Sequence, residues 1–158
     1  MTETETEIEK NLDLLAEGLW ARLRDILLAQ SRWDGFVRDP EGGQLQAVPP
    51  PDDRERVASE MVLRALHVAV DPVNNAILHL LAGEERVAIA SLMEQTGLSR
   101  IGVIERVNDL SQVGLASYEV EAREARATAG ASGLLGLFDD VSERLTRILE
   151  KRWNADSR

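Results

Sequence analysis

Apolar residues recur every three or four positions along much of this chain, the spacing that buries one face of an α-helix. From Ile8 to about Leu28 the pattern predicts a long amphipathic helix, with positions 8, 12, 15, 19, 23 and 26 on its inner face. A second helix is expected from about Asp53 to Val70. Between them, residues 31–53 are rich in glycine and proline, which break both periodic patterns and predict a linker.

Three shorter helices are predicted between Asp71 and Gly114. The first begins at Asp71-Pro72, because aspartate caps a helix N-terminus and proline fits the first helical position. The second ends at Gly97, where glycine can adopt the left-handed conformation. Ser99 caps the third helix. We expect its inner face to be aliphatic, formed by Val103, Val107 and Leu110.

The segments ASYEVEA and ARATA follow, and their alternation with period two predicts a short β-hairpin around Arg123 and Glu124. Thr128 then begins the last helix. Together these elements predict a mainly α fold, a winged helix-turn-helix with a short β-hairpin wing and long N- and C-terminal helices.

This pattern resembles that of the ArsR-type family of bacterial transcription regulators. The match covers about residues 60–153 and rests on Asp71, Pro72, Leu80, Leu81, Gly97, Leu98, Ser99, Val113, Gly114 and Leu115. The resemblance implies a winged-helix regulator that binds double-stranded DNA. Where members of that family carry cysteine metal ligands in the second helix, this chain has VAIASL, so we expect no metal-sensing site.

The same pattern divides the chain into four segments. We expect an N-terminal amphipathic helix over residues 1–30, a linker over 31–53, a winged-helix domain over 54–153 and a tail over 154–158. The domain includes a C-terminal helix that we expect to form a dimer.

The outward face of the third helix and the wing form the candidate binding surface. In helix-turn-helix proteins this face enters the major groove, where arginine and asparagine read bases, while wing residues contact phosphates. The candidates are Arg100, Ile101, Ile104, Glu105, Arg106, Asn108, Arg123 and Arg126.

Part of this surface does not suit DNA. Ile101 and Ile104 cannot hydrogen-bond to bases, and Glu105 would repel phosphate. A module that binds a protein partner through the third helix is therefore the alternative function. A continuous positive stripe around the arginines would favour DNA, whereas acidic interruption near the isoleucines would favour a protein.

The last helix carries a second candidate surface. Its apolar residues follow a four-three-four-three spacing, which predicts a seam between helices. They are Leu134, Phe138, Val141, Leu145 and Ile148. Packing within the chain is the alternative. A homodimer built from the first and last helices would place two third helices symmetrically, which suits palindromic DNA and equally a symmetric adaptor.

The amino-acid composition argues against several other kinds of site and function. The 158-residue chain has a net charge of −10, which argues against indiscriminate binding to polyanions. It has no cysteine, and His67 and His79 lack partners at ligand spacing, so we expect neither a metal site nor a cofactor. No nucleophile or phosphate-loop motif is present, so we do not expect an enzyme. The absence of long apolar runs and the acidic start MTETETEIEK predict a cytoplasmic protein without membrane contact.

Overall fold

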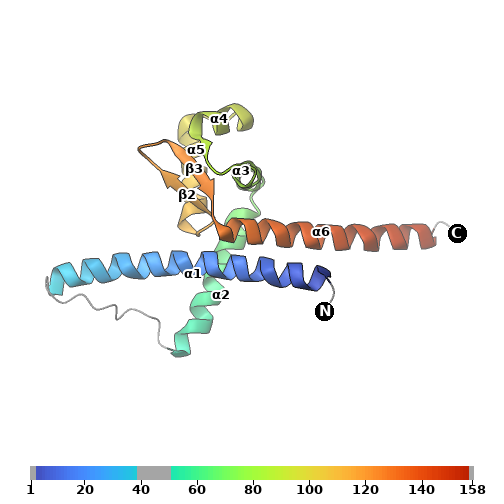
Figure 1. Ribbon diagram of the computed structural model, residues 1–158, viewed down its shortest axis with the longest axis horizontal. Coiled ribbons are helices and arrows are strands. Elements are labelled where there is room, and N and C mark those ends of the chain that lie inside the picture. Colours follow the sequence, from blue (N-terminus) through green and yellow to red (C-terminus); the bar gives the residue numbers. More distant parts are fainter. Residues whose placement is uncertain (1–2, 39–50, 157–158) are drawn as a thin grey trace.

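The structure is a computed structural model that describes residues 3–38 and 51–156. Its elements are α1 (Glu3–Arg38), α2 (Pro51–Ala69), α3 (Pro72–Ala82), β1 (Val87–Ala88), α4 (Ile89–Thr96), α5 (Arg100–Gln112), β2 (Ala116–Glu119), β3 (Glu124–Ala127) and α6 (Ala129–Asp156). Helices α3 to α5 and the sheet form one body, and α1 and α6 lie side by side beneath it (Figure 1). This is the predicted winged helix-turn-helix fold.

The helix caps predicted at Asp71, Ser99 and Thr128 and the helix end predicted at Gly97 are confirmed. The carboxylate of Asp71 accepts hydrogen bonds from two backbone N–H groups in the first turn of α3, at 3.0 and 3.1 Å. The hydroxyl of Ser99 accepts one from the first turn of α5, and that of Thr128 accepts one from the first turn of α6. Gly97 ends α4 with a φ of 70°, a conformation that favours glycine.

The core of the body lies between α3, α4 and α5. Its largest fully buried side chains are Ile77, Leu78, Leu81, Leu92, Val103, Val107, Leu110, Leu115 and Leu134. The aliphatic inner face expected for α5 is therefore confirmed. Leu78 is buried because α3 is covered from several sides, by α2, α4, α5, α6 and β3.

The sheet has three antiparallel strands in the order β1-β3-β2. Strands β2 and β3 form the predicted hairpin, with Glu119 opposite Glu124 next to the turn. Strand β1 adds Val87 opposite Ala125 on the other edge of β3. The sequence does not predict this strand, because two residues are too short to show a period.

Helices α1 and α6 run in opposite directions and approach very closely through glycines (Figure 1). A Cβ added at Gly18 would lie 2.5 Å from the Cα of Gly130, and one added at Gly133 would lie 2.4 Å from the carbonyl oxygen of Asn11. The buried amide of Asn11 also donates a hydrogen bond to Asp140 at 3.2 Å. Much of the α6 start is thus used for packing within the chain.

The boundaries of the long helices differ from those expected. Residues 31–38, predicted as linker, form the end of α1, because a single glycine at position 35 costs a helix only about 1 kcal/mol. Helix α2 begins at Pro51, two residues before its expected start. Helix α6 continues to Asp156, into the expected tail. The remaining linker, residues 39–50, lies outside the described residues.

Candidate functional site

Helix α5 presents one face to solvent because the opposite face is fully buried in the core. Glu105 and Asn108 are exposed on this outer face, and Arg100 is exposed in the first turn of the helix. Ile101 is 70% exposed. The exposed side chains of α5 thus include two that can donate hydrogen bonds, Arg100 and Asn108, together with a carboxylate and an apolar side chain.

Ile104 does not share the outer face, contrary to the prediction. It is partly buried and packs against the core. With about 100° of rotation per residue, its direction is only about 60° from that of the buried Val107, whereas Ile101 points about 180° away from Leu110. The helix therefore exposes one isoleucine rather than a pair.

Arg106 is predicted to flank the binding face, but in the structure it faces the start of α3. Its Nη1 lies 3.2 Å from the Asp71 carboxylate and 3.5 Å from the side-chain oxygen of Asn74. Asn74 is itself buried and donates to the carbonyl oxygen of Val68. Arg106 thus joins α5 to α3, and we remove it from the candidate contacts.

The surroundings of Asp71 hold the pKa of its carboxyl group below the ordinary value of 3.8. The largest cause is the hydrogen bond from the backbone N–H of Asn74; desolvation acts in the opposite direction, but the hydrogen bond from Val73 and the charge of Arg106 add to the lowering of the pKa. These two hydrogen bonds and the charge all favour the ionised carboxylate.

This shift predicts that acid weakens the contribution of Asp71 to stability. Asp71→Asn keeps a capping side chain but removes the charge. The parent should be more stable than the variant near pH 6, and the difference should shrink as pH falls below about 4. In that range the unfolded carboxyl takes up a proton before the folded one, so lower pH favours unfolding. Urea titrations near pH 6 and pH 3 measure this difference, and a difference that grows in acid would contradict the assignment.

The wing presents two exposed arginines, Arg123 and Arg126. Arg123 lies in the hairpin turn with a φ of 56°, an unusual conformation for a residue other than glycine. Its carbonyl oxygen accepts a hydrogen bond from the backbone N–H of Ile89 at 3.0 Å. This bond ties the wing turn to the start of α4 and fixes the wing beside the helices.

Acidic residues interrupt the positive charge of this surface. Glu105 and Asp109 are exposed on α5. At the wing, Nη1 of Arg86 lies 3.2 Å from the Glu119 carboxylate and 3.7 Å from that of Glu124. Carboxylates on α5 and in the wing therefore interrupt the positive stripe that would favour DNA.

The predicted seam of α6 divides into two parts. Leu134 is only 1% exposed, and Phe138 packs against the core, so both serve packing within the chain. They lie in the part of α6 that α1 covers. Beyond it the helix exposes large apolar side chains along one stripe, the distal α6 stripe. Its members are Val141 at 63%, Leu145 at 53%, Ile148 at 51% and Leu149 at 58% exposure.

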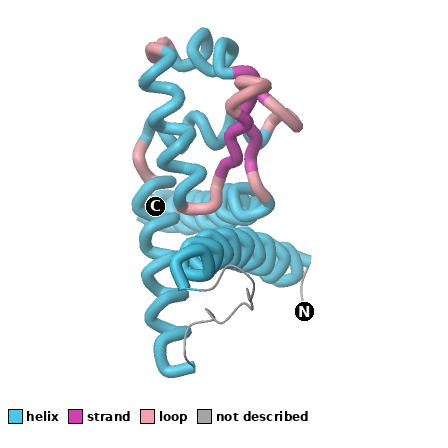
Figure 2. Tube along the Cα trace, turned by 90° about the vertical axis from the view of Figure 1, so that its left-hand side faces the viewer, coloured by secondary structure: helices cyan, strands magenta, loops and turns pink. Residues whose placement is uncertain are grey.

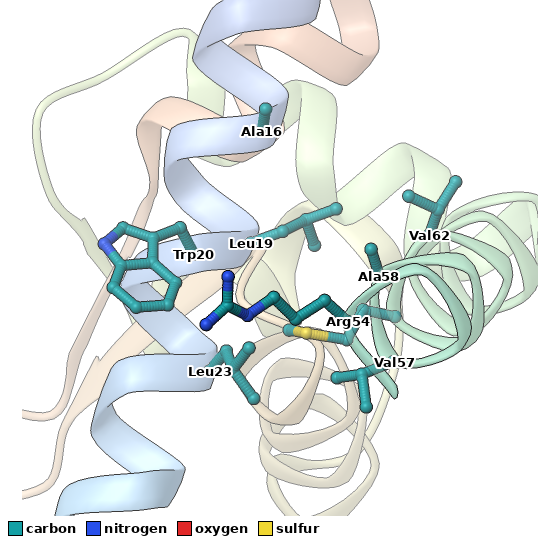
Figure 3. Close-up of a pocket in the computed structure, with 9 residues that line it drawn as sticks. Ala16, Leu19, Trp20, Leu23, Arg54, Val57, Ala58 and Val62 are labelled. Carbon is teal, nitrogen blue, oxygen red and sulfur yellow. The ribbon is translucent and has the colours of Figure 1, made fainter. Parts of the chain in front are cut away.

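The structure also contains an apolar groove that the sequence does not predict (Figure 3). It lies between α1 and α2 and has a volume of about 360 Å³. Its lining residues are Ala16, Leu19, Trp20, Leu23, Arg54, Val57, Ala58, Met61 and Val62. The periodicity places several of them on apolar helix faces, but no signal in the sequence indicates that the two faces meet with a gap between them.

Among residues 3–38 and 51–156, no group of three or more histidine, cysteine, aspartate or glutamate side chains is placed to hold a metal ion. None of the helices within these residues combines the length and the hydrophobicity that crossing a membrane requires.

No family model matches the chain, and no curated protein is found as a relative. Among solved structures, the crystal structure of NolR from Sinorhizobium fredii is similar, with 20% sequence identity and a TM-score of 0.48. The alignment covers 61% of this chain and 96% of that chain. At this level of similarity the comparisons assign neither a family nor an activity.

Proposed function

We propose that the protein is a cytoplasmic bacterial transcription regulator, which binds double-stranded DNA as a homodimer without a metal-sensing site. The observation that carries the proposal is the arrangement of α5 and the wing. Helix α5 is exposed along one side, with Arg100 and Asn108 available for base edges. The wing packs beside it and carries Arg123 and Arg126, which can contact phosphates.

The distal α6 stripe supports the homodimer. Four large apolar side chains, each more than half exposed, are costly to leave in water on one helix. A two-fold axis across this stripe would bury them against the same residues of a second copy. It would also place two α5 helices symmetrically, as a palindromic site requires. No catalytic role and no cofactor form part of this proposal.

A protein-binding function is the second candidate, and a specific observation favours it. Ile101 on α5 and Val120 in the wing are each 70% exposed, and carboxylates stand on the same elements. Phosphates would be repelled by these carboxylates, whereas a protein could bury the two apolar side chains as anchors.

A double variant of the wing arginines and a single variant at Ile101 distinguish DNA binding from protein binding. If DNA is the ligand, Arg123→Ala with Arg126→Ala should weaken binding and reduce its salt dependence by about one unit of slope for each phosphate that the variant no longer neutralises. Ile101→Ser should then change DNA affinity little, since isoleucine forms no hydrogen bond with a base. If a protein is the ligand, Ile101→Ser should cost about 1–2 kcal/mol of affinity, with little effect of salt.

The readouts are fluorescence anisotropy with labelled genomic duplexes and co-purification from the source cell. Ile104→Ser is not used, because it would disturb the core. Equal loss of DNA affinity in the arginine and Ile101 variants would contradict the DNA proposal. Unchanged recovery of the same partner by Ile101→Ser would contradict the protein alternative.

A further inference from the structure

A second cleft lies where the C-terminal end of α5 meets α1 and α2, and its lining is more polar than that of the groove at Trp20. Helix α2 passes beside α1 and continues up to the body, so side chains of both helices reach this point (Figure 2). The cleft has a volume of about 580 Å³, within the range of about 300–1,000 Å³ found for small-molecule sites.

Three basic side chains line this cleft and form what we call the basic cluster. Arg22 comes from α1, whereas Arg64 and His67 come from α2, one turn apart. No carboxylate lines the cleft among the described residues, although aspartate and glutamate outnumber lysine and arginine by 28 to 18 in the chain. Two guanidinium groups and an imidazole therefore gather at one point of an acidic protein.

Two carboxylates that stand near the basic cluster in the sequence pair with other arginines. Glu60, one turn before Arg64 on α2, lies 3.1 Å from Arg56. Asp25, on the adjacent turn of α1, lies 3.9 Å from Arg24. Within residues 3–38 and 51–156, no carboxylate forms an ion pair with a member of the basic cluster. The charge of the two guanidinium groups is thus not neutralised inside this part of the chain.

Contacts within the chain hold Arg22 in place but use little of its guanidinium. Its Nε donates a hydrogen bond to the carbonyl oxygen of Gln112, the last residue of α5, at 3.0 Å. A guanidinium has five N–H donors, and this bond uses one of them. The terminal nitrogens form no hydrogen bond with another described residue. Arg22 is therefore oriented by α5 and keeps donors for a ligand.

Apolar side chains form the rest of the wall. Leu63 is 63% exposed, and Ile26 on α1 is partly exposed. An organic group bound in the cleft would remove part of this surface from water. The cleft thus combines several hydrogen-bond donors that suit an anion with an apolar surface that suits an organic group.

We propose that this cleft binds a small organic phosphate monoester. Its phosphate would accept hydrogen bonds from the basic cluster, and its organic part would cover Leu63. A phosphate monoester carries a charge of about −1.5 to −2 at pH 7 and has three oxygens that accept strong hydrogen bonds. Two guanidinium groups match this charge, and three donor side chains match the three oxygens. A carboxylate has one charge and two oxygens, so it would match the cluster less well.

Isothermal titration of the full chain with phenyl phosphate at pH 8 tests the proposal. The probe is a dianion there, because the second pKa of a phosphate monoester is about 6. We expect saturable binding, and about fivefold or more weaker binding of phenyl sulfate, which has the same ring and a tetrahedral group but only one negative charge. Arg64→Gln should weaken the binding of phenyl phosphate by about tenfold or more.

The matched control is Arg56→Gln, which removes the same charge from the same helix. Arg56 pairs with Asp53 and Glu60 and does not line the cleft, so the affinity for phenyl phosphate should change less than about twofold. Circular dichroism melting establishes that each variant is folded before titration.

Three results would overturn the proposal. They are no saturable heat with millimolar phenyl phosphate, equal affinity for phenyl sulfate, and equal losses in the Arg64 and Arg56 variants. Weaker duplex binding by Arg64→Gln, without phenyl phosphate binding by the parent, would instead assign the basic cluster to the DNA surface. The titration contains no DNA, so its outcome is independent of the proposed regulatory function.

Discussion

Replacing Gly133 with alanine is expected to lower the free energy of unfolding by about 2 kcal/mol, because the added Cβ has no room between α6 and α1. It would lie 2.4 Å from the carbonyl oxygen of Asn11 and 2.6 Å from the backbone nitrogen of Leu15. Both contacts are with backbone atoms, so α1 itself must move. Overpacking of this kind lowers the free energy of unfolding by about 3 kcal/mol, and the higher helix propensity of alanine offsets about 1 kcal/mol of this loss.

Thermal melting measures this effect, and the Tm should fall by about 4–8 °C for a chain of this size. Gly102→Ala is the matched control, since it is also a glycine within a helix. A Cβ there would lie 3.4 Å from the Ser99 hydroxyl oxygen and 3.8 Å from the Cβ of Leu98, both on side chains. The control should be as stable as the parent or more so. Equal shifts in the two variants would mean that close packing of α1 on α6 is not what requires glycine at position 133.

The second large effect concerns the distal α6 stripe. Val141→Glu with Leu145→Glu is expected to convert a dimer into a folded monomer and to weaken self-association at least 100-fold, about 2.7 kcal/mol. Both side chains are more than half exposed within one chain, so the glutamates meet water in the monomer. In the dimer they would be buried without partners.

Sedimentation equilibrium measures this association. Thr146→Glu with Arg147→Gln is the control, because it changes the net charge of the same exposed helix by the same two units on the side away from the stripe. The control should remain dimeric. A monomeric parent protein, or equal dissociation of the two double variants, would contradict an interface at the distal α6 stripe.

Local signals made much of the fold predictable. The caps at Asp71 and Ser99 and the stop at Gly97 depend on neighbouring residues, so the sequence contains what is needed to find them. The burial of Val103 and Val107 follows from helical spacing alone. The exposed residues of α5 could be selected by the same reasoning, because the face opposite a buried stripe is fixed by geometry.

The structure differs from the predictions where segments that are distant in the sequence contact each other. Arg106 is turned away from the binding face by Asp71, 35 residues earlier in the chain, and spacing along one helix carries no information about that partner. The heptad spacing assigns Leu134 to a dimer seam, but α6 begins beneath the body of the same chain. The groove at Trp20 likewise depends on how α1 crosses α2.

Binding of the unmodified protein to duplex DNA tests the central claim most directly. Labelled genomic duplexes should be titrated at salt concentrations from about 20 to 200 mM. If each subunit uses Arg123 and Arg126 on phosphates, a dimer makes four such contacts, and the logarithm of the association constant should fall with the logarithm of salt at a slope of about −4. Saturable binding with this slope is the predicted result. Absence of binding to any duplex at the lowest salt concentration would contradict the account.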